Sequence, residues 1–147
     1  MTDVFSKKKR SWIMGRVKGR DTKPEILVRS IVHRMGYRFR IHRRELPGNP
    51  DIVLPRHRKV IFVHGCFWHG HRRCPRSERP SSNKSFWNTK LDKNVERDER
   101  LRRALRRMGW KVFVVWECET RAPDKVLRKL GRFLNDERRK EAKANRP

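Results

Sequence analysis

Short apolar runs, each bounded by turn residues, set the fold class of this chain. Residues 37–41 alternate apolar side chains with arginines, which is the period of a half-buried strand. Residues 51–54 and 60–63 are typical of two short strands joined by a basic hairpin loop, and 110–116 of a fourth strand. The hairpin strands are almost entirely apolar, so we expect them at the centre of the sheet.

Helical periodicity surrounds these strands. Residues 21–25 combine a capping side chain, a proline and a carboxylate, which is typical of a helix N-terminus, and that helix should stop at Gly36. Apolar residues recur at helical spacing over 91–108 and again over 123–134. The order helix, three strands, helix, strand, helix predicts an α/β fold with a mixed central sheet flanked by helices.

The length of the chain, 147 residues, suits one compact core but not two ordinary domains. We therefore expect one folded domain over 21–135, preceded by a basic segment over 1–20. The tail, 136–147, is highly charged, and we expect it to be disordered. Residues 1–10 lack the apolar core of a signal peptide, and no apolar run is long enough to span a membrane. These features predict a cytoplasmic protein.

The positive charge of the chain exceeds anything that folding requires. Forty-one Lys and Arg residues outnumber 16 Asp and Glu, which gives a formal net charge of +25. Such an excess attracts a polyanion, and because the basic residues lie along the whole sequence we expect a surface patch rather than one basic arm. An anionic membrane surface is the alternative, but we see no long amphipathic helix with an apolar face beside the charge. We therefore expect nucleic acid as the partner.

Cysteine and histidine cluster in a segment that has no periodicity. This segment follows the third predicted strand and needs a fastening of its own. Cys66, Cys74 and the later Cys118, with either His69 or His71, supply three thiolates and an imidazole, the donor set of a closed zinc site. Alternatively the cysteines are merely buried and the histidines face phosphate. Three cysteines, an odd number, argue against a disulfide framework, so we expect a structural zinc loop.

Two strand ends suggest a site for phosphodiester chemistry. Asp51 begins the second predicted strand and His64 ends the third, so their side chains could converge. A carboxylate can hold a divalent metal while an imidazole accepts a proton from water. Each residue also has an ordinary explanation: Asp51 follows a proline as turn residues do, Glu25 suits a helix start, and Asp98 can pair with a neighbouring arginine.

Three sequence blocks together resemble one family of DNA-cutting enzymes. The blocks 50–51 (PD), 62–69 (FVHGCFWH) and 93–98 (KNVERD) are similar to the very-short-patch-repair endonucleases, and the resemblance spans roughly 10–119. It implies a restriction-endonuclease-like fold with a structural zinc loop. It also implies a magnesium-dependent nick in one DNA strand, 5′ to the thymine of a T:G mismatch that arises by deamination of 5-methylcytosine, leaving a 5′-phosphate.

The resemblance implies the residues that hold the catalytic metal. Asp51 matches the principal magnesium ligand, assisted by the backbone carbonyl of Val63, and Glu25 matches an acidic position near metal-bound water. Two departures from the family pattern stand out. The family has threonine at the position of Val63, so a hydroxyl is absent here. The zinc segment, with residues 72–73 between His71 and Cys74, is one residue longer than in the family.

The histidines divide between catalysis and zinc on the same resemblance. His69 is similar to the family's general base, oriented by Asp98, and His64 to a phosphate-facing helper. A carboxylate that accepts one imidazole N–H fixes the tautomer and leaves the other nitrogen free to accept a proton. The resemblance thereby implies His71, beside the three cysteines, as the fourth zinc ligand.

The resemblance also implies how DNA is read. Trp12 and Met14 fall in a segment similar to an amino-terminal helix that grips DNA from the opposite groove, and Lys90 and Asn94 match positions that contact the mismatch. Aromatic residues usually belong in the core, but a mismatch weakens stacking and eases the entry of a wedge. We expect three aromatic rings to enter the base stack: Phe67, Trp68 and Trp87.

We expect a monomeric endonuclease domain over 21–135 with a DNA-gripping segment over 1–20. Its partner would be double-stranded DNA that contains a mismatch, in the nucleoid of the bacterial cytoplasm, with mismatch-repair proteins as candidate partners. Two other classes of function fit parts of the pattern. One is a zinc-stabilised DNA-binding module without catalysis, and the other is a restriction or homing nuclease that cuts both strands.

Overall fold

The computed structural model describes residues 21–144, with side chains up to residue 135. The predicted DNA-gripping segment, with Trp12 and Met14, lies outside the described residues. In the part that is described, no helix is both long and apolar enough to cross a membrane.

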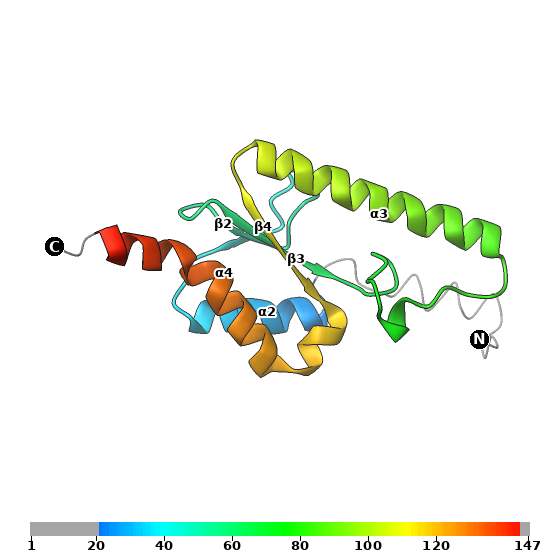
Figure 1. The fold of residues 1–147 in the computed structure, drawn as a ribbon, viewed down its shortest axis with the longest axis horizontal. Coiled ribbons are helices and arrows are strands. Elements are labelled where there is room, and N and C mark those ends of the chain that lie inside the picture. The colour runs from blue at the N-terminus through cyan, green and yellow to red at the C-terminus, as the bar shows by residue number, and fades with distance from the viewer. Residues whose placement is uncertain (1–20, 145–147) are drawn as a thin grey trace.

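A four-stranded mixed sheet forms the centre of the fold, as predicted (Figure 1). Its strands lie side by side in chain order: β1 (Arg40–Ile41), β2 (Ile52–Leu54), β3 (Lys59–His64) and β4 (Lys111–Trp116). The pairs β1/β2 and β2/β3 are antiparallel, and β3/β4 is parallel. The two hairpin strands, β2 and β3, are central and almost completely buried, which confirms the expectation from their apolar sequence.

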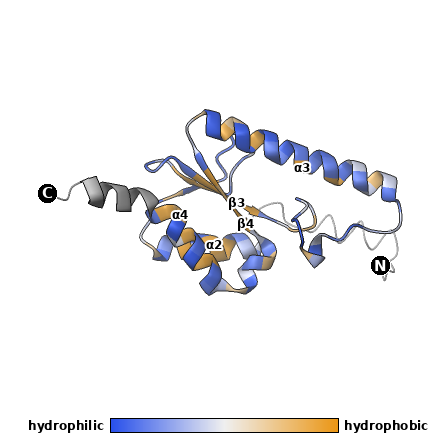
Figure 2. Ribbon diagram, in the orientation of Figure 1, coloured by the Kyte–Doolittle hydropathy of each residue, from blue (hydrophilic) through white to orange (hydrophobic). Residues whose placement is uncertain are grey.

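Helices cover both faces of this sheet (Figure 1). On one face, α2 (Lys23–Arg34) and α4 (Pro123–Ala144) pack against alternate side chains of the strands. On the other, α3 (Lys84–Arg107) packs mainly through Leu105. The rest of α3 is largely hydrophilic (Figure 2), so most of this long helix faces solvent rather than a core.

The predicted start and end of α2 are confirmed. The Thr22 hydroxyl accepts a hydrogen bond from the Glu25 amide at 3.4 Å, and Pro24 occupies the first turn. The helix ends where Gly36 adopts a positive φ of 87°, a conformation that glycine reaches at low cost. This cap places Glu25 at the N-terminal end of α2, beside the edge of the sheet.

Two predicted boundaries were wrong. The strand expected over 37–41 is only Arg40–Ile41, because the Tyr37 amide bonds the Val32 carbonyl and so belongs to the end of α2. Tyr37 is buried, and its hydroxyl donates to Asn135 Oδ1 at 2.5 Å. The helix expected over 123–134 continues as α4 up to Ala144, and the Glu, Arg, Lys and Ala residues of this extension are all good helix formers.

Candidate active site

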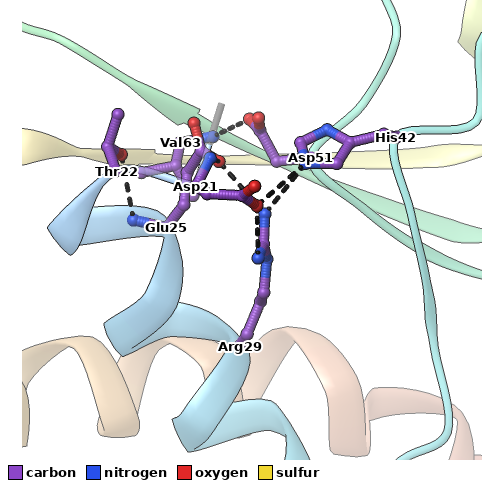
Figure 3. A network of polar contacts seen from close by, with 7 residues as sticks. All are labelled: Asp21, Thr22, Glu25, Arg29, His42, Asp51 and Val63. Carbon is purple, nitrogen blue, oxygen red and sulfur yellow. Dashed lines mark hydrogen bonds and ion pairs between the residues drawn. The ribbon is translucent and has the colours of Figure 1, made fainter. Parts of the chain in front are cut away.

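Asp51 lies directly before β2, and its carboxylate is tied to the neighbouring strand. Asp51 Oδ2 accepts a hydrogen bond from the Val63 amide at 2.6 Å (Figure 3). Burial, with a smaller contribution from the nearby Glu25 carboxylate, raises the pKa of the Asp51 carboxyl to about 6, although the Val63 hydrogen bond opposes this shift. A buried carboxylate in this state is stabilised by a cation, because a cation offsets the lost hydration.

Two imidazoles stand beside this carboxylate and are stacked on each other. The His64 and His69 rings lie 3.9 Å apart with an interplanar angle of 9°. His69 Nδ1 is 2.6 Å from Asp98 Oδ2 on α3, and because an ionised carboxylate only accepts, Nδ1 carries the proton. Although burial alone would raise the pKa of Asp98, the His69 hydrogen bond holds it below its ordinary value. His69 therefore keeps Nε2 free to accept a proton.

His64 is the more buried of the two imidazoles. Burial, and then the adjacent His69, lower the pKa of His64 to about 3. Its Nδ1 has no hydrogen-bond partner within the described part of the chain. In the free protein His64 is consequently neutral near pH 7, so it can exchange hydrogen bonds with a phosphate but cannot contribute a positive charge.

One cavity joins these groups. It has a volume of about 1040 Å³, and Arg97 and Arg102 on α3 add positive charge to its wall. All five residues predicted to be catalytic line it: Glu25, Asp51, His64, His69 and Asp98. The structure thus brings together side chains from α2, the start of β2, the end of β3, the following loop and α3.

Sequence reasoning missed two further residues near Glu25, Arg29 and His42. Glu25 is only 4% exposed, and its carboxylate is held by the Asp21 amide at 2.8 Å and by Arg29 at 3.2 Å. Arg29 follows Glu25 by four residues on one helix, a spacing that could have indicated the pair. His42 lies beyond β1 and belongs to no periodic pattern.

The three cysteines converge with one histidine in a second cluster. The ligand atoms of Cys66, His71, Cys74 and Cys118 all lie within 4.8 Å of one another. His71, not His69, stands in this cluster, with Nδ1 3.4 Å from Cys118 Sγ. Burial raises the pKa of the Cys66 thiol to about 12, and a bound cation is what stabilises a thiolate at such a position. This cluster could hold a metal.

The parallel pairing of β3 with β4 explains how Cys118 reaches the cluster. His64 pairs with Trp116, and Cys66 and Cys118 each follow two residues later. The Cys118 amide donates to Cys66 Sγ at 3.4 Å. The short 3-10 helix Glu117–Arg121 begins at this point and turns the chain towards the loop. The cluster therefore joins the irregular loop to the end of the sheet.

Aromatic side chains form a separate group beside the metal-ligand loop. Trp68 and Trp87 contact Phe67, with ring centroids at 5.1 and 5.5 Å, and all three rings are half-buried rather than part of either core cluster. The predicted contacts Lys90 and Asn94 join this group, the first over the Trp68 ring and the second through the Trp68 carbonyl. Phe86, which sequence reasoning missed, adds a ring that is 58% exposed.

Comparison with known proteins identifies the family of this chain. Residues 2–76 match the family described as DNA mismatch endonuclease Vsr. Type II nicking enzyme V.XorIIP of Xanthomonas oryzae pv. oryzae is 50% identical over 119 residues, which cover 81% of this chain and 87% of that protein. DNA mismatch endonuclease Vsr of Escherichia coli is 43% identical over 126 residues, covering 86% and 80% of the two chains. Type II nicking enzyme V.NmeAIP of Neisseria meningitidis is 42% identical over 136 residues, covering 92% and 96%. The family match and these identities over most of both chains show that the chain belongs to the Vsr family of DNA mismatch endonucleases.

Proposed function

We propose that this protein is a magnesium-dependent endonuclease that nicks one strand of DNA on the 5′ side of the thymine in a T:G mismatch. The observation that carries the proposal is one cavity shared by the buried Asp51 carboxylate and the Asp98–His69 pair. This is the combination that metal-assisted hydrolysis of a phosphodiester needs, a cation ligand beside a general base. The names of the relatives supply the DNA mismatch and the nick.

The donor set around Asp51 fits magnesium. Mg²⁺ prefers oxygen ligands and is usually held by one or two carboxylates together with substrate phosphate oxygens. Asp51 and the Val63 carbonyl would hold the ion, and Glu25 would orient water at its edge. When bound, the ion would polarise the phosphate and stabilise the negative charge that develops during hydrolysis.

The chain's own residues would manage the proton and orient the phosphate. His69 accepts a proton from the attacking water at Nε2, since its Nδ1–H is held by Asp98. The stacked His64 fixes the plane of the His69 ring, and as a neutral imidazole it offers a hydrogen bond to a phosphate oxygen. Arg97 and Arg102 attract the DNA backbone to the cavity.

Asp98→Asn should slow nicking by about 100-fold or more, because a positioned general base contributes about 10²–10⁴-fold and an amide no longer fixes the His69 tautomer. Single-turnover rates on a mismatched duplex would measure this loss. Asp92→Asn is the matched control on the same helix: Asp92 is exposed and pairs with Arg79, so its replacement should leave the rate unchanged. Nearly full activity of Asp98→Asn would contradict the assigned base.

We infer that the cysteine and histidine cluster holds a structural zinc ion. Three thiolates and one imidazole are a common closed set for Zn²⁺, and four protein ligands leave no open position for a substrate. The ion would fasten the loop that carries His69, Phe67 and Trp68, because Cys66 and His71 flank these residues in the sequence. Zinc would in this way position the catalytic and aromatic residues without taking part in the reaction.

DNA recognition would divide between charge and aromatic rings. The net charge of +25 supplies contacts to phosphate, which are strong, sensitive to salt and independent of sequence. The rings of Phe67, Trp68 and Trp87 would enter the stack at a mismatched step, which opens more easily than a paired one. Lys90 and Asn94, which are predicted to contact the mismatch, lie on the N-terminal half of α3, as Trp87 does.

Removing two rings, in Phe67→Ala/Trp68→Ala, should abolish most of the preference for mismatched over paired DNA, while salt-sensitive binding to all DNA remains. Stacking on an aromatic ring is worth about 1–3 kcal/mol per base. Affinities for both duplexes, measured beside thermal stability, would test this expectation. Phe133→Ala removes a ring that stacks on Phe113, so it should lower Tm without altering the preference. A destabilised double variant with an unchanged preference would refute the wedge.

Duplexes that are labelled on both strands and carry every mismatch, with a fully paired control, would separate the three classes of function. We expect a magnesium-dependent nick in the thymine strand of the T:G duplex only. Cleavage of both strands in paired DNA would favour a restriction or homing nuclease, and tight binding without any cut would favour a non-catalytic module.

We further propose a monomer in the bacterial cytoplasm, and sedimentation of the protein with and without DNA would test the oligomeric state.

A further inference from the structure

A buried guanidinium stands at the edge of the candidate active site and has no part in the mechanism above. Arg29 points from α2 towards the start of that helix, where Asp21 and Glu25 lie (Figure 3). Its NH1 is 2.8 Å from Asp21 Oδ1 and its NH2 is 3.2 Å from Glu25 Oε2. His42 Nε2 lies 3.0 Å from the same NH2. The guanidinium is thus enclosed by two carboxylates and an imidazole.

The burial of this network distinguishes it from a surface ion pair. The side chains of Arg29 and Glu25 are only 16% and 5% exposed. Arg29 Nε is buried, and no group in the described residues accepts its hydrogen. An unsatisfied buried donor is unfavourable, whereas exposed pairs at this helical spacing stabilise only weakly. Helix stability alone therefore does not account for the position of Arg29.

What the network holds in place is the carboxylate of Glu25. Glu25 Oε2 accepts from Arg29 and also from the Asp21 amide at 2.8 Å, so this oxygen is fixed from two directions. Asp21 itself has a φ of 58°, a left-handed conformation that costs energy in a residue other than glycine. Glu25 lines the same cavity as Asp51, where a shift of the carboxylate would alter the surroundings of the reacting groups.

We propose that Arg29 is a positioning residue of the nuclease, whose guanidinium holds Glu25 in one orientation at the edge of the cavity and neutralises its charge. The inference rests on the proposed function. Glu25 and Asp51 bring two carboxylates to one cavity, and Arg29 is the fixed cation beside the first of them. Asp51 is left as the carboxylate available to the divalent ion. His42 completes the enclosure, because its Nε2 lies 3.0 Å from Arg29 NH2 and 3.3 Å from Asp21 Oδ1.

Arg29→Gln should separate turnover from metal affinity. Loss of a residue that orients a group beside a metal typically costs about 10–100-fold, so we expect kcat to fall by that factor. The half-saturating Mg²⁺ concentration should not rise, because removing a positive charge makes the cavity more attractive to a divalent cation. A residue that served only helix stability would lower Tm and leave kcat unchanged well below Tm.

The test compares the natural protein with Arg29→Gln, Arg29→Lys and Glu25→Gln, and with a variant that carries both glutamines. Single-turnover nicking, Tm, and Mn²⁺ binding followed by calorimetry are measured for each. Arg29→Lys keeps the charge but cannot span both carboxylates, so it should lose less activity than Arg29→Gln. If Arg29 acts through Glu25, Arg29→Gln should cost little in the Glu25→Gln background. Arg34→Gln, on the exposed end of the same helix, is the matched control and should behave like the natural protein.

Three results would overturn the inference. The first is an Arg29→Gln protein that is folded and nicks at the natural rate. The second is an equal loss with and without Glu25, which would mean that Arg29 does not act through this carboxylate. The third is weakened Mn²⁺ binding together with full recovery of kcat at high Mg²⁺. A natural protein that nicks no duplex would be a different failure, that of the proposed function, and would remove the basis of the inference as well.

Discussion

Asp51→Ala should bind mismatched DNA almost as tightly as the natural protein and should nick it at least about 10³-fold more slowly. The magnitude follows because a metal that stabilises transition-state charge is worth several kcal/mol, and about 1.4 kcal/mol corresponds to each factor of ten. Affinity should survive, since the basic residues that contact phosphate are unchanged. Quench experiments at saturating Mg²⁺, with affinities measured in EDTA, would give both quantities. Nearly normal turnover would end the assignment of Asp51 as a metal ligand.

Two companion variants test whether Asp51→Ala loses activity only because the fold is disturbed. Asp51→Asn keeps the size of the side chain and an oxygen for the Val63 amide, but it removes the negative charge that binds the metal. It should therefore lose as much activity as Asp51→Ala. Because burial disfavours the ionised Asp51 carboxylate, Asp51→Asn should not lower Tm in the absence of metal. Natural proteins often keep such destabilising groups at functional sites. Asp124→Ala, at the exposed start of α4, is the control and should alter neither activity nor affinity.

Local patterns predicted most of the fold because their causes are local. The caps of α2 and the apolar hairpin of β2 and β3 depend on neighbouring residues, and each was found where the sequence indicated. The strand expected over 37–41 failed for a tertiary reason. Tyr37 closes the end of α2 and fills the core, so the alternation around it reflects burial of a turn rather than a strand.

The candidate site was only partly predictable from the sequence. Motif resemblance named the residues that line the cavity and placed His71 with the cysteines, but it could not show that His64 stacks on His69 or how His71 reaches the cysteines. Both depend on how the loop after β3 crosses the end of the sheet. The long-range partner Cys118 needed the parallel register of β3 and β4, and no periodicity reveals a register.

The Arg29 network shows a different limit of prediction from the sequence. Helical spacing places Arg29 on the same face as Glu25, and this much could be read from the sequence. The third partner, His42, comes from a segment beyond β1, where it meets Arg29 only through the tertiary fold. Buried polar networks of this kind arise where distant segments meet, so they fall outside any pattern with a period of two or 3.6 residues.

Removal of zinc should unfold the loop that carries the histidines and lower Tm of the whole domain. Structural zinc contributes an apparent binding free energy of about 10–16 kcal/mol in small zinc-binding peptides, which is comparable with the total stability of about 5–15 kcal/mol of a typical domain. We expect one zinc ion per chain by elemental analysis, and cooperative loss of near-ultraviolet dichroism when a strong chelator is added. Folded, stable protein that contains no zinc would exclude this site.

Cysteine variants should show a graded loss, because the four ligands come from two parts of the chain. Cys118→Ser removes the only ligand outside the loop, so zinc held by Cys66, His71 and Cys74 would no longer tie the loop to the end of β4. We therefore expect a lower Tm and weaker zinc binding, together with lost nicking, since His69 lies in the released segment. His33→Ala, an exposed histidine of α2, is the control and should keep its zinc. Unchanged zinc content and Tm in Cys118→Ser would mean that the long-range link contributes nothing.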